Sequence, residues 1–199
     1  MNQFYNNTTL EITTEKGIAK IWIDGKDYGE TPTTIENLPE GTYLIELERI
    51  VGEGSSFYEK QAFQIDLTRN TSARIDLEIG PDDLLHGVLL YYTPIRTSSQ
   101  EGFLTVISDA QNSRVFLDGE FLKETPITNL NLKEDEYKIT VIPAGHEEVE
   151  IPVLIRNNYA LNLKTFHFPI PVSFDTLEEE ESAEEVDSEN ISEEEITDE

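Results

Sequence analysis

The sequence predicts an all-β protein made of two tandem small β-sandwich domains, followed by a disordered acidic tail. Three observations support this prediction: an internal repeat at a spacing of 94 residues, alternation of apolar and polar residues along each copy, and an acidic run at the end of the sequence. Alternation with a period of two is typical of strands with one buried and one solvated face. No stretch before residue 175 shows helical periodicity.

The repeat is clear over its first half and changes length in its second half. Residues 21–47 align without a gap with residues 115–141, and 11 of these 27 positions are identical. Further on, the Arg-Asn pair at 69–70 aligns with the Arg-Asn pair at 156–157 at an offset of 87. This second match predicts that the first copy carries a loop with about seven extra residues. A repeat of this kind indicates a fold unit that occurs twice.

Apolar residues at every second position predict the strands of each copy. In the first copy they are Ile21 and Ile23, then Tyr43, Ile45 and Leu47, then Phe63, Ile65 and Leu67. In the second copy they are Val115 and Leu117, then Tyr137, Ile139 and Val141, then Val149, Ile151, Val153 and Ile155. Several short strands separated by turn signals favour a sandwich of two antiparallel sheets in each copy.

An Asp-Gly dipeptide stands between two extended runs in each copy, as Asp24 and Gly25 and again as Asp118 and Gly119. Both residue types tolerate a positive φ, so this dipeptide predicts a tight hairpin. The two aspartates could also be a catalytic or calcium-binding pair. We favour turn residues that bond their own backbone, because a turn requires the same residue types in both copies.

A Thr-Pro dipeptide follows each hairpin, as Thr31 and Pro32 and again as Thr125 and Pro126. Proline forces the residue before it into an extended conformation and lacks a backbone donor. The dipeptide therefore suits the entry to an edge strand, or a chain that crosses from one sheet to the other. We predict that all eight residues of the two dipeptides are structural.

The order of strand, Asp-Gly, Thr-Pro, Leu-x-x-Gly-x-Tyr and apolar strand resembles the PEGA domain. The stretch "IPAGHEEVEI" at 142–151 is similar to a further element of that family, with His146 in place of the usual aromatic residue. The first copy has the enlarged loop "RIVGEGSSFYEKQAF" there and matches less well. The resemblance covers roughly 8–80 and 102–166.

The resemblance implies a transthyretin- or immunoglobulin-like β-sandwich in each copy. PEGA domains are found in bacteria and archaea, mostly outside the membrane in surface-layer, envelope and anchored multidomain proteins. No enzymatic activity is generally ascribed to them. The resemblance therefore implies a non-enzymatic protein at the cell surface, whereas a cytoplasmic location is the alternative.

The charge of the chain restricts its partners. The formal net charge is −27, and residues 175–199 hold 14 of the 41 acidic residues without any Lys or Arg, which leaves −13 on residues 1–174. An acidic chain lacks the basic stripe that nucleic acid and anionic lipid require. We therefore expect neither nucleic-acid binding nor docking on an anionic membrane. The absence of cysteine excludes disulfides, thiolate catalysis and cysteine zinc sites.

No apolar run approaches the length of about 18 residues that crosses a bilayer, so we expect no membrane insertion by this chain. The first twelve residues have neither a basic nor an apolar region, and we expect no Sec signal peptide there. The oligomeric state is not predicted.

No catalytic, metal or cofactor site is predicted. The three histidines, His86, His146 and His167, are far apart and share no metal-ligand spacing. The stretch "DDLLH" at 82–86 could offer carboxylates and an imidazole, but we favour a solvated linker. No nucleotide-binding loop, calcium-binding loop or nucleophile elbow occurs in the sequence.

Four aromatic residues are candidates for interaction. Trp22 and Phe116 are equivalent, and both stand on the polar phase of their strands. They could stack on a sugar or anchor a partner, or they could pack across strands, which we favour. Phe57 and Tyr58 lie in the enlarged loop of the first copy, where an insertion could determine specificity.

We predict five segments along the chain: a sandwich at 8–80, an apolar extended linker at 81–101, a sandwich at 102–168, a proline-containing strap at 169–174 and a disordered tail at 175–199. Within the linker, "VLLYYTPI" is too apolar to be solvated, and we expect it to form a strand or to pack against a domain. The two prolines of the strap predict an edge strand or a polyproline stretch. The acidic composition of the tail cannot bury enough apolar surface to order it.

The leading functional hypothesis is a non-catalytic spacer, scaffold or adhesion module that contacts proteins, as part of a prokaryotic envelope. The alternatives are a module that binds carbohydrate or cell wall through Trp22, Phe116 or the loop at 52–58, and an accessory part of a larger enzyme.

Overall fold

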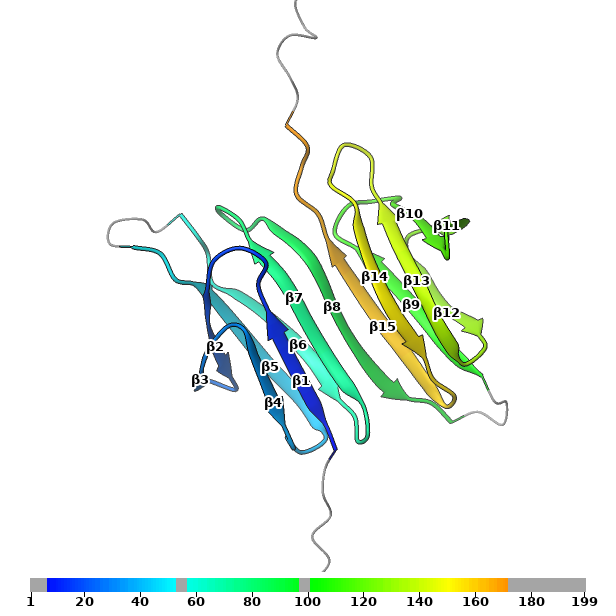
Figure 1. Cartoon of the computed structure of the whole chain (residues 1–199), viewed down its shortest axis with the longest axis horizontal. Coiled ribbons are helices and arrows are strands. Elements are labelled where there is room, and N and C mark those ends of the chain that lie inside the picture. The colour runs from blue at the N-terminus through cyan, green and yellow to red at the C-terminus, as the bar shows by residue number, and fades with distance from the viewer. Residues whose placement is uncertain (1–6, 53–56, 97–100, 172–199) are drawn as a thin grey trace, which may run out of the picture. The chain divides into compact units, whose positions relative to one another are not determined.

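The structure, a computed structural model, describes residues 7–52, 57–96 and 101–171. Across these residues it contains fifteen β-strands in three sheets and no helix, so the predicted all-β class is confirmed (Figure 1). The predicted tail at 175–199 and the last residues of the predicted strap lie outside the described residues.

The strands of the first repeat follow one another through turns. They are β1 (Thr9–Thr13), β2 (Ala19–Ile23), β3 (Lys26–Glu30), β4 (Thr33–Glu36), β5 (Gly41–Arg49), β6 (Gln61–Leu67) and β7 (Ser72–Ile79). β8 (Leu85–Pro94) comes next.

The second repeat has the same seven strands in the same order. They are β9 (Gly102–Ser108), β10 (Arg114–Leu117), β11 (Glu120–Glu124), β12 (Ile127–Leu132), β13 (Asp135–Ile142), β14 (Val149–Ile155) and β15 (Tyr159–Phe166). Among the described residues, β8 has no counterpart in this repetition.

Each repeat has a small four-stranded sheet of its own, in the order β3-β2-β5-β6 and β11-β10-β13-β14. The other strands of both repeats belong to one seven-stranded sheet in the order β12-β9-β15-β8-β7-β1-β4. Each small sheet packs on its own half of this large sheet, because the two apolar cores combine residues of both layers. The two predicted sandwiches are therefore present, but they share a sheet. The prediction of antiparallel sheets is wrong for this large sheet, which is mixed, because β1 pairs parallel with β7 and β9 pairs parallel with β15.

The shared sheet depends on β8, which pairs antiparallel with β7 on one side and with β15 on the other, as Figure 1 shows. Its side chains alternate between the two cores. Leu85 and Leu89 are buried in the core of the first repeat, whereas Val88, Leu90 and Tyr92 are buried in the core of the second. Successive side chains of a strand point to opposite faces, so the two cores lie on opposite faces of the large sheet.

This arrangement explains why the run "GVLLYY" shows no alternation in the sequence. A strand with an apolar core on each face needs apolar residues at both phases. Gly87 lies where the strand passes close to β7. Its φ is +128°, and a β-carbon there would lie 2.1 Å from the carbonyl oxygen of Asp76. Only glycine fits this position without displacing β7.

The predicted linker at 81–101 thus contains a central strand of the large sheet, and the expectation that "VLLYYTPI" is extended is confirmed. The interpretation of 82–86 as a solvated linker is correct for Asp82 and Asp83, which are exposed. It is wrong for Leu85 and His86, which are buried and half-buried in β8.

The alignment of the second half of the repeat needs a correction. Tyr43 pairs with Ile65, and its equivalent Tyr137 pairs with Val153, so the true offset along β6 and β14 is 88. The left-handed residues of the following turns, Asn70 and Asn158, obey the same offset. The Arg-Asn match at an offset of 87 is therefore out of register by one residue, and the loop is six residues longer, not seven.

The end of β15 belongs to the first repeat's core. Phe166 is buried there, and its ring meets that of Phe63 edge-on at a centroid distance of 5.8 Å. His167 is buried as well, and Pro169 forms an isolated bridge with His146. The strap predicted at 169–174 thus begins at this bridge, and its described residues, 169–171, are exposed.

Candidate functional site

The repeated aspartates each connect two strands of a small sheet. The N–H of Leu44 in β5 donates to Oδ1 of Asp24 at 2.9 Å, and the N–H of Asp24 donates to the Leu44 carbonyl at 2.9 Å. Asp118 and Lys138 make the same pair of bonds at 2.7 and 2.8 Å. Both aspartates have a positive φ. They are turn residues as predicted, but each bonds the neighbouring strand rather than its own turn.

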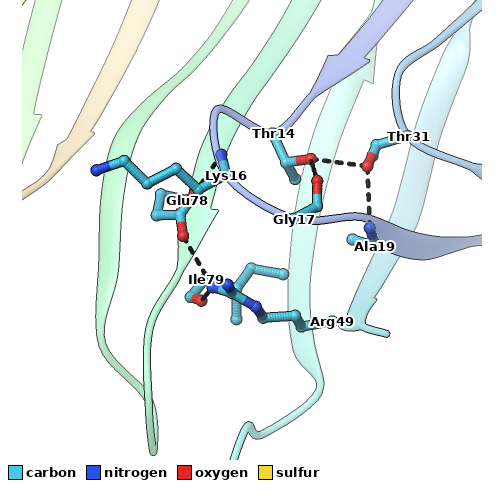
Figure 2. A network of polar contacts seen from close by, with 8 residues as sticks. All are labelled: Thr14, Lys16, Gly17, Ala19, Thr31, Arg49, Glu78 and Ile79. Atoms are coloured by element: carbon cyan, nitrogen blue, oxygen red, sulfur yellow. Dashed lines mark hydrogen bonds and ion pairs between the residues drawn. The ribbon is translucent and has the colours of Figure 1, made fainter. Parts of the chain in front are cut away.

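The repeated threonines bond the backbone at the beginning of an inner strand. Thr31 bonds Ala19, the first residue of β2, and Thr125 bonds Ser113, the residue before β10. Thr31 donates its N–H to the Ala19 carbonyl at 2.9 Å. Its Oγ1 accepts the Ala19 N–H, also at 2.9 Å, as Figure 2 shows. Thr125 makes the same two bonds with Ser113, at 2.9 and 3.1 Å. Both threonines are buried, and the prolines after them begin the crossing from the small sheet to β4 or β12.

These strands, β4 and β12, stand at the two ends of the described seven-stranded sheet. The two functions predicted for Thr-Pro, entry to an edge strand and crossing between sheets, therefore both occur here. All eight dipeptide residues lie in turns or strand connections. This geometry accounts for them as structural residues.

Trp22 lies half-buried on the outer face of the first small sheet, beside a shallow hollow. The ammonium group of Lys60 is 4.0 Å from the centre of its ring, and that of Lys20 is 5.2 Å away. Each lysine also pairs with a carboxylate, Lys60 with Glu46 at 2.8 Å and Lys20 with Asp27 at 3.1 Å. The indole ring of Trp22 is thus already engaged in cation–π contacts with two lysines of the same repeat.

Phe116 packs in a comparable way. Its ring meets that of Phe121 edge-on at a centroid distance of 5.7 Å, and the guanidinium of Arg114 lies 6.0 Å from it. The geometry of both equivalent aromatics agrees with packing across strands, which we favoured over stacking on a sugar.

The two loop aromatics differ from each other. Phe57 is 69% exposed, whereas Tyr58 is half-buried against the core of the first repeat with Arg49 over its ring at 4.7 Å. The structure thus leaves Phe57 available to a partner and uses Tyr58 for packing.

A buried ion pair lies next to Tyr58. The guanidinium of Arg49 donates to Glu78 at 2.8 Å and also to the carbonyl of Ile79. Glu78 accepts the backbone N–H of Lys16 at 2.6 Å, as Figure 2 shows. These bonds join β5, β7 and the turn before β2 in the first repeat.

The structure gathers the three histidines, which are far apart in the sequence, around Glu147. Nε2 of His86 lies 3.6 Å from Oε2 of Glu147, and the ring of His86 packs against Phe168. Nδ1 of His167 bonds the Glu147 carbonyl at 2.8 Å. Within the described residues, no group of three or more possible ligands is placed to hold a metal ion.

Burial lowers the pKa of His167, although its bond to the Glu147 carbonyl and the charge of Asp109 oppose the shift. Its Nδ1 faces a carbonyl and therefore carries the proton, and its Nε2 lies 2.9 Å from the hydroxyl of Thr165. The lowered pKa favours the neutral form of the ring, and its hydrogen bonds fit a structural role.

Two grooves lie where the edge of a small sheet meets the back of the other repeat's half of the large sheet. The β14 groove has a volume of about 450 Å³ and is lined by Thr13, Glu15, Arg74, Asp76, Glu78, His86, Gly87, Val88 and residues 148–152. The β6 groove has a volume of about 200 Å³ and is lined by Ala62, Phe63, Gln64, Leu89, Tyr91, Thr105, Ile107, Asn162, Leu163 and Lys164.

The two grooves occupy equivalent places but differ in charge. Carboxylates of Glu15, Asp76, Glu78, Glu148 and Glu150 line the β14 groove. Arg74, the one Lys or Arg among the described lining residues, pairs with Asp76. Among the described residues that line the β6 groove, Lys164 is the one charged side chain. The first groove therefore disfavours anions, and the second admits them.

Neither groove is evident from the sequence. Each combines strands of both repeats, and their relation depends on β8. The contrast between Gln64 and Pro152 could have pointed to them, because these residues are equivalent at an offset of 88. At the offset of 87 chosen from the Arg-Asn match, Pro152 falls opposite Ile65 and the contrast is lost.

The fold and the repeated turn residues define a protein of two tandem β-sandwich modules. The family model described as the PEGA domain matches residues 7–82 and 101–167, and the chain therefore belongs to the PEGA domain family. No curated protein and no solved structure matches the chain. Among the residues that the structure describes, no helix has the length and apolar character required to cross a membrane.

Proposed function

We propose that this protein is a non-catalytic scaffold in which two PEGA modules form one structural unit that spaces and presents binding surfaces. The observation that carries the proposal is the burial of β8 in both cores at once. A flexible linker would let two modules move independently. A shared central strand couples them through a hydrogen-bonded ladder on each side.

The repeated residues support a scaffold rather than a catalyst. Asp24 and Asp118 bond backbone N–H groups, and Thr31 and Thr125 are buried with their hydroxyls engaged. A general base or nucleophile requires a side chain in reach of a substrate. We extend the proposal to an extracytoplasmic location in a prokaryotic envelope. This part rests on the usual location of PEGA domains.

The coupling of the modules can be tested with the single tryptophan, Trp22, which lies in the first repeat. Val106 is fully buried in the core of the second repeat, and we expect Val106→Ala to destabilise that core by about 2 kcal/mol. Urea unfolding is followed by Trp22 fluorescence and by far-UV circular dichroism. If the repeats form one unit, the variant shifts both transitions equally.

A matched control is Leu154→Ala, which changes an exposed side chain of the second repeat and should leave both transitions in place. A Trp22 transition that stays unchanged in Val106→Ala, while the dichroism transition splits, would contradict the proposal. Turnover of any substrate by the purified chain, in a broad screen, would overturn its non-catalytic part.

A further inference from the structure

The edge of β6 presents free backbone groups. Leu44 directs its N–H and carbonyl to Asp24, away from β6, so its partner Gln64 belongs to a non-hydrogen-bonded pair. The N–H and carbonyl of Gln64 therefore point outward, and by alternation so do those of Ala62 and Asp66. In the sheets of the described residues, β6 stands at one end and pairs with β5 alone.

The equivalent edge of β14 is closed. Pro152 pairs with Lys138, whose N–H and carbonyl face Asp118, so Pro152 points outward and has no N–H to offer. Two residues further on, at the next outward-facing position, the carbonyl of Leu154 accepts the hydroxyl of Tyr92 at 2.6 Å. Proline and an occupied carbonyl are both ways of blocking strand addition. The first repeat has Gln64 and Asp66 at these positions.

The surface beside the β6 edge can receive side chains. Tyr91 of β8 is half-buried beside the groove, and Ile107 of β9, which also lines it, is 46% exposed. Lys164 adds a positive charge where the β14 groove has Asp76 at the equivalent place in its sheet, because Asp76 pairs with Thr13 as Lys164 pairs with Ile107. An extended ligand with alternating apolar residues and a carboxylate would match this surface.

We propose that the β6 edge binds an extended peptide with apolar side chains and at least one carboxylate, which adds to the first small sheet as a fifth strand. Main-chain hydrogen bonds to Ala62, Gln64 and Asp66 supply affinity. The groove and Lys164 determine which peptide sequences bind best. The inference deepens the proposed scaffold function by naming a partner class, and its test does not depend on how the repeats unfold.

The test compares the whole chain with its Gln64→Pro variant. This substitution installs the residue that the second repeat already has at the equivalent position, so we expect the fold to tolerate it on an edge strand. A phage-displayed library of random peptides is selected on the wild-type chain, with soluble Gln64→Pro protein as competitor. Selected peptides are then synthesised, and their affinities are measured by fluorescence polarisation.

We expect the selected peptides to combine alternating apolar residues with an acidic residue. Their affinity should fall by about tenfold or more for Gln64→Pro, because the variant loses a donor and places a ring in the path of the strand. Bound peptide should also slow hydrogen exchange at the amides of Ala62, Gln64 and Asp66. Failure to enrich any peptide over the competitor, or equal affinity for both proteins, would overturn the proposal.

A second variant keeps the test valid if Gln64→Pro does not fold. Lys164→Glu changes an exposed side chain, and it should weaken acidic peptides while sparing matched peptides in which the acid is replaced by its amide. An unchanged preference for the acid would count against the proposal. A wild-type dimer in sedimentation that Gln64→Pro dissociates would instead assign the edge to a second copy of this chain and overturn the peptide.

Discussion

The two repeats share the residues that make their turns and differ along the edges that face the grooves. Asp24 and Asp118, like Thr31 and Thr125, make the same bonds at nearly the same distances. At the edges, one repeat has Gln64 where the other has Pro152, and one groove is acidic where the other carries a lysine. Backbone geometry requires the first set of residues, whereas the second set is free to serve recognition.

A further difference lies on β7 and β15. Asp76 and Lys164 occupy equivalent positions, because they pair with Thr13 and Ile107. Glu78 and Phe166, two residues further along each strand, are therefore equivalent as well. Glu78 is buried in an ion pair with Arg49, while Phe166 packs on Phe63 in the first repeat's core. The same place in the fold is thus stabilised by charge in one repeat and by apolar contact in the other. Five predictions test how far this comparison holds.

The largest effect is expected for the apolar member of the pair. We predict that Phe166→Ala lowers the free energy of unfolding by about 4 kcal/mol, as large-to-small changes of buried aromatic residues do. Because Phe166 lies in the first repeat's core, the Trp22 fluorescence transition should move with it. Urea unfolding measures the change, and Phe57→Ala, at a side chain that is 69% exposed, is the control with little effect.

Removing one partner of the ion pair should cost somewhat less. We predict that Arg49→Ala lowers the free energy of unfolding by about 3 kcal/mol, because it leaves the buried Glu78 carboxylate without its counter-charge. The double variant Arg49→Met with Glu78→Leu should recover most of this loss in the same urea experiment. A double variant as unstable as Arg49→Ala would refute the explanation by an unpaired charge.

The exposed pair Lys138–Glu150 serves as the control for charge, because both side chains are more than half exposed. We expect Lys138→Ala to change stability by less than about 1 kcal/mol, as surface ion pairs usually do. An equal loss at both places would mean that burial does not decide the strength of these pairs.

The repeated aspartates should matter equally. We predict that Asp24→Ala and Asp118→Ala each cost about 1 kcal/mol, since each removes one acceptor of a backbone N–H. The two losses should add, because the turns lie in different sheets. Asparagine keeps an acceptor and tolerates positive φ, so Asp24→Asn should be close to wild type. Unequal losses at the two sites would break the equivalence of the repeats.

The smallest effect concerns pH. Burial lowers the pKa of His167 in the folded state below its ordinary value of 6.5. The unfolded chain therefore binds a proton first as the pH falls, so stability is lost as the pH drops below about 6.5 towards the folded pKa. His167→Gln should remove this part of the dependence. The free energy of unfolding of wild type and variant is measured at about pH 7.5 and about pH 5.5, one unit above and below the ordinary pKa of 6.5. A difference that does not change with pH would contradict it.

Much of the fold follows from local patterns in the sequence. Apolar residues at every second position mark the strands, Asp-Gly marks the hairpins, and Thr-Pro marks the crossings. These signals act over a few residues, where sterics and hydrogen bonding decide the conformation. The roles of Phe57 and Tyr58 could not be told apart from the sequence. The two residues are neighbours in one loop, and only their tertiary surroundings distinguish them.

The sequence by itself determined that the protein is a repeated all-β sandwich with structural turn residues. Only the tertiary structure decided that β8 joins the two sandwiches, that three distant histidines meet at Glu147, and that one sheet edge is open while its equivalent is closed. The reason is that pairing partners and register are not local properties. An apolar run such as "GVLLYY" is compatible with several burial arrangements, and a shift of one residue, as at Arg69 and Arg156, turns every side chain to the other face.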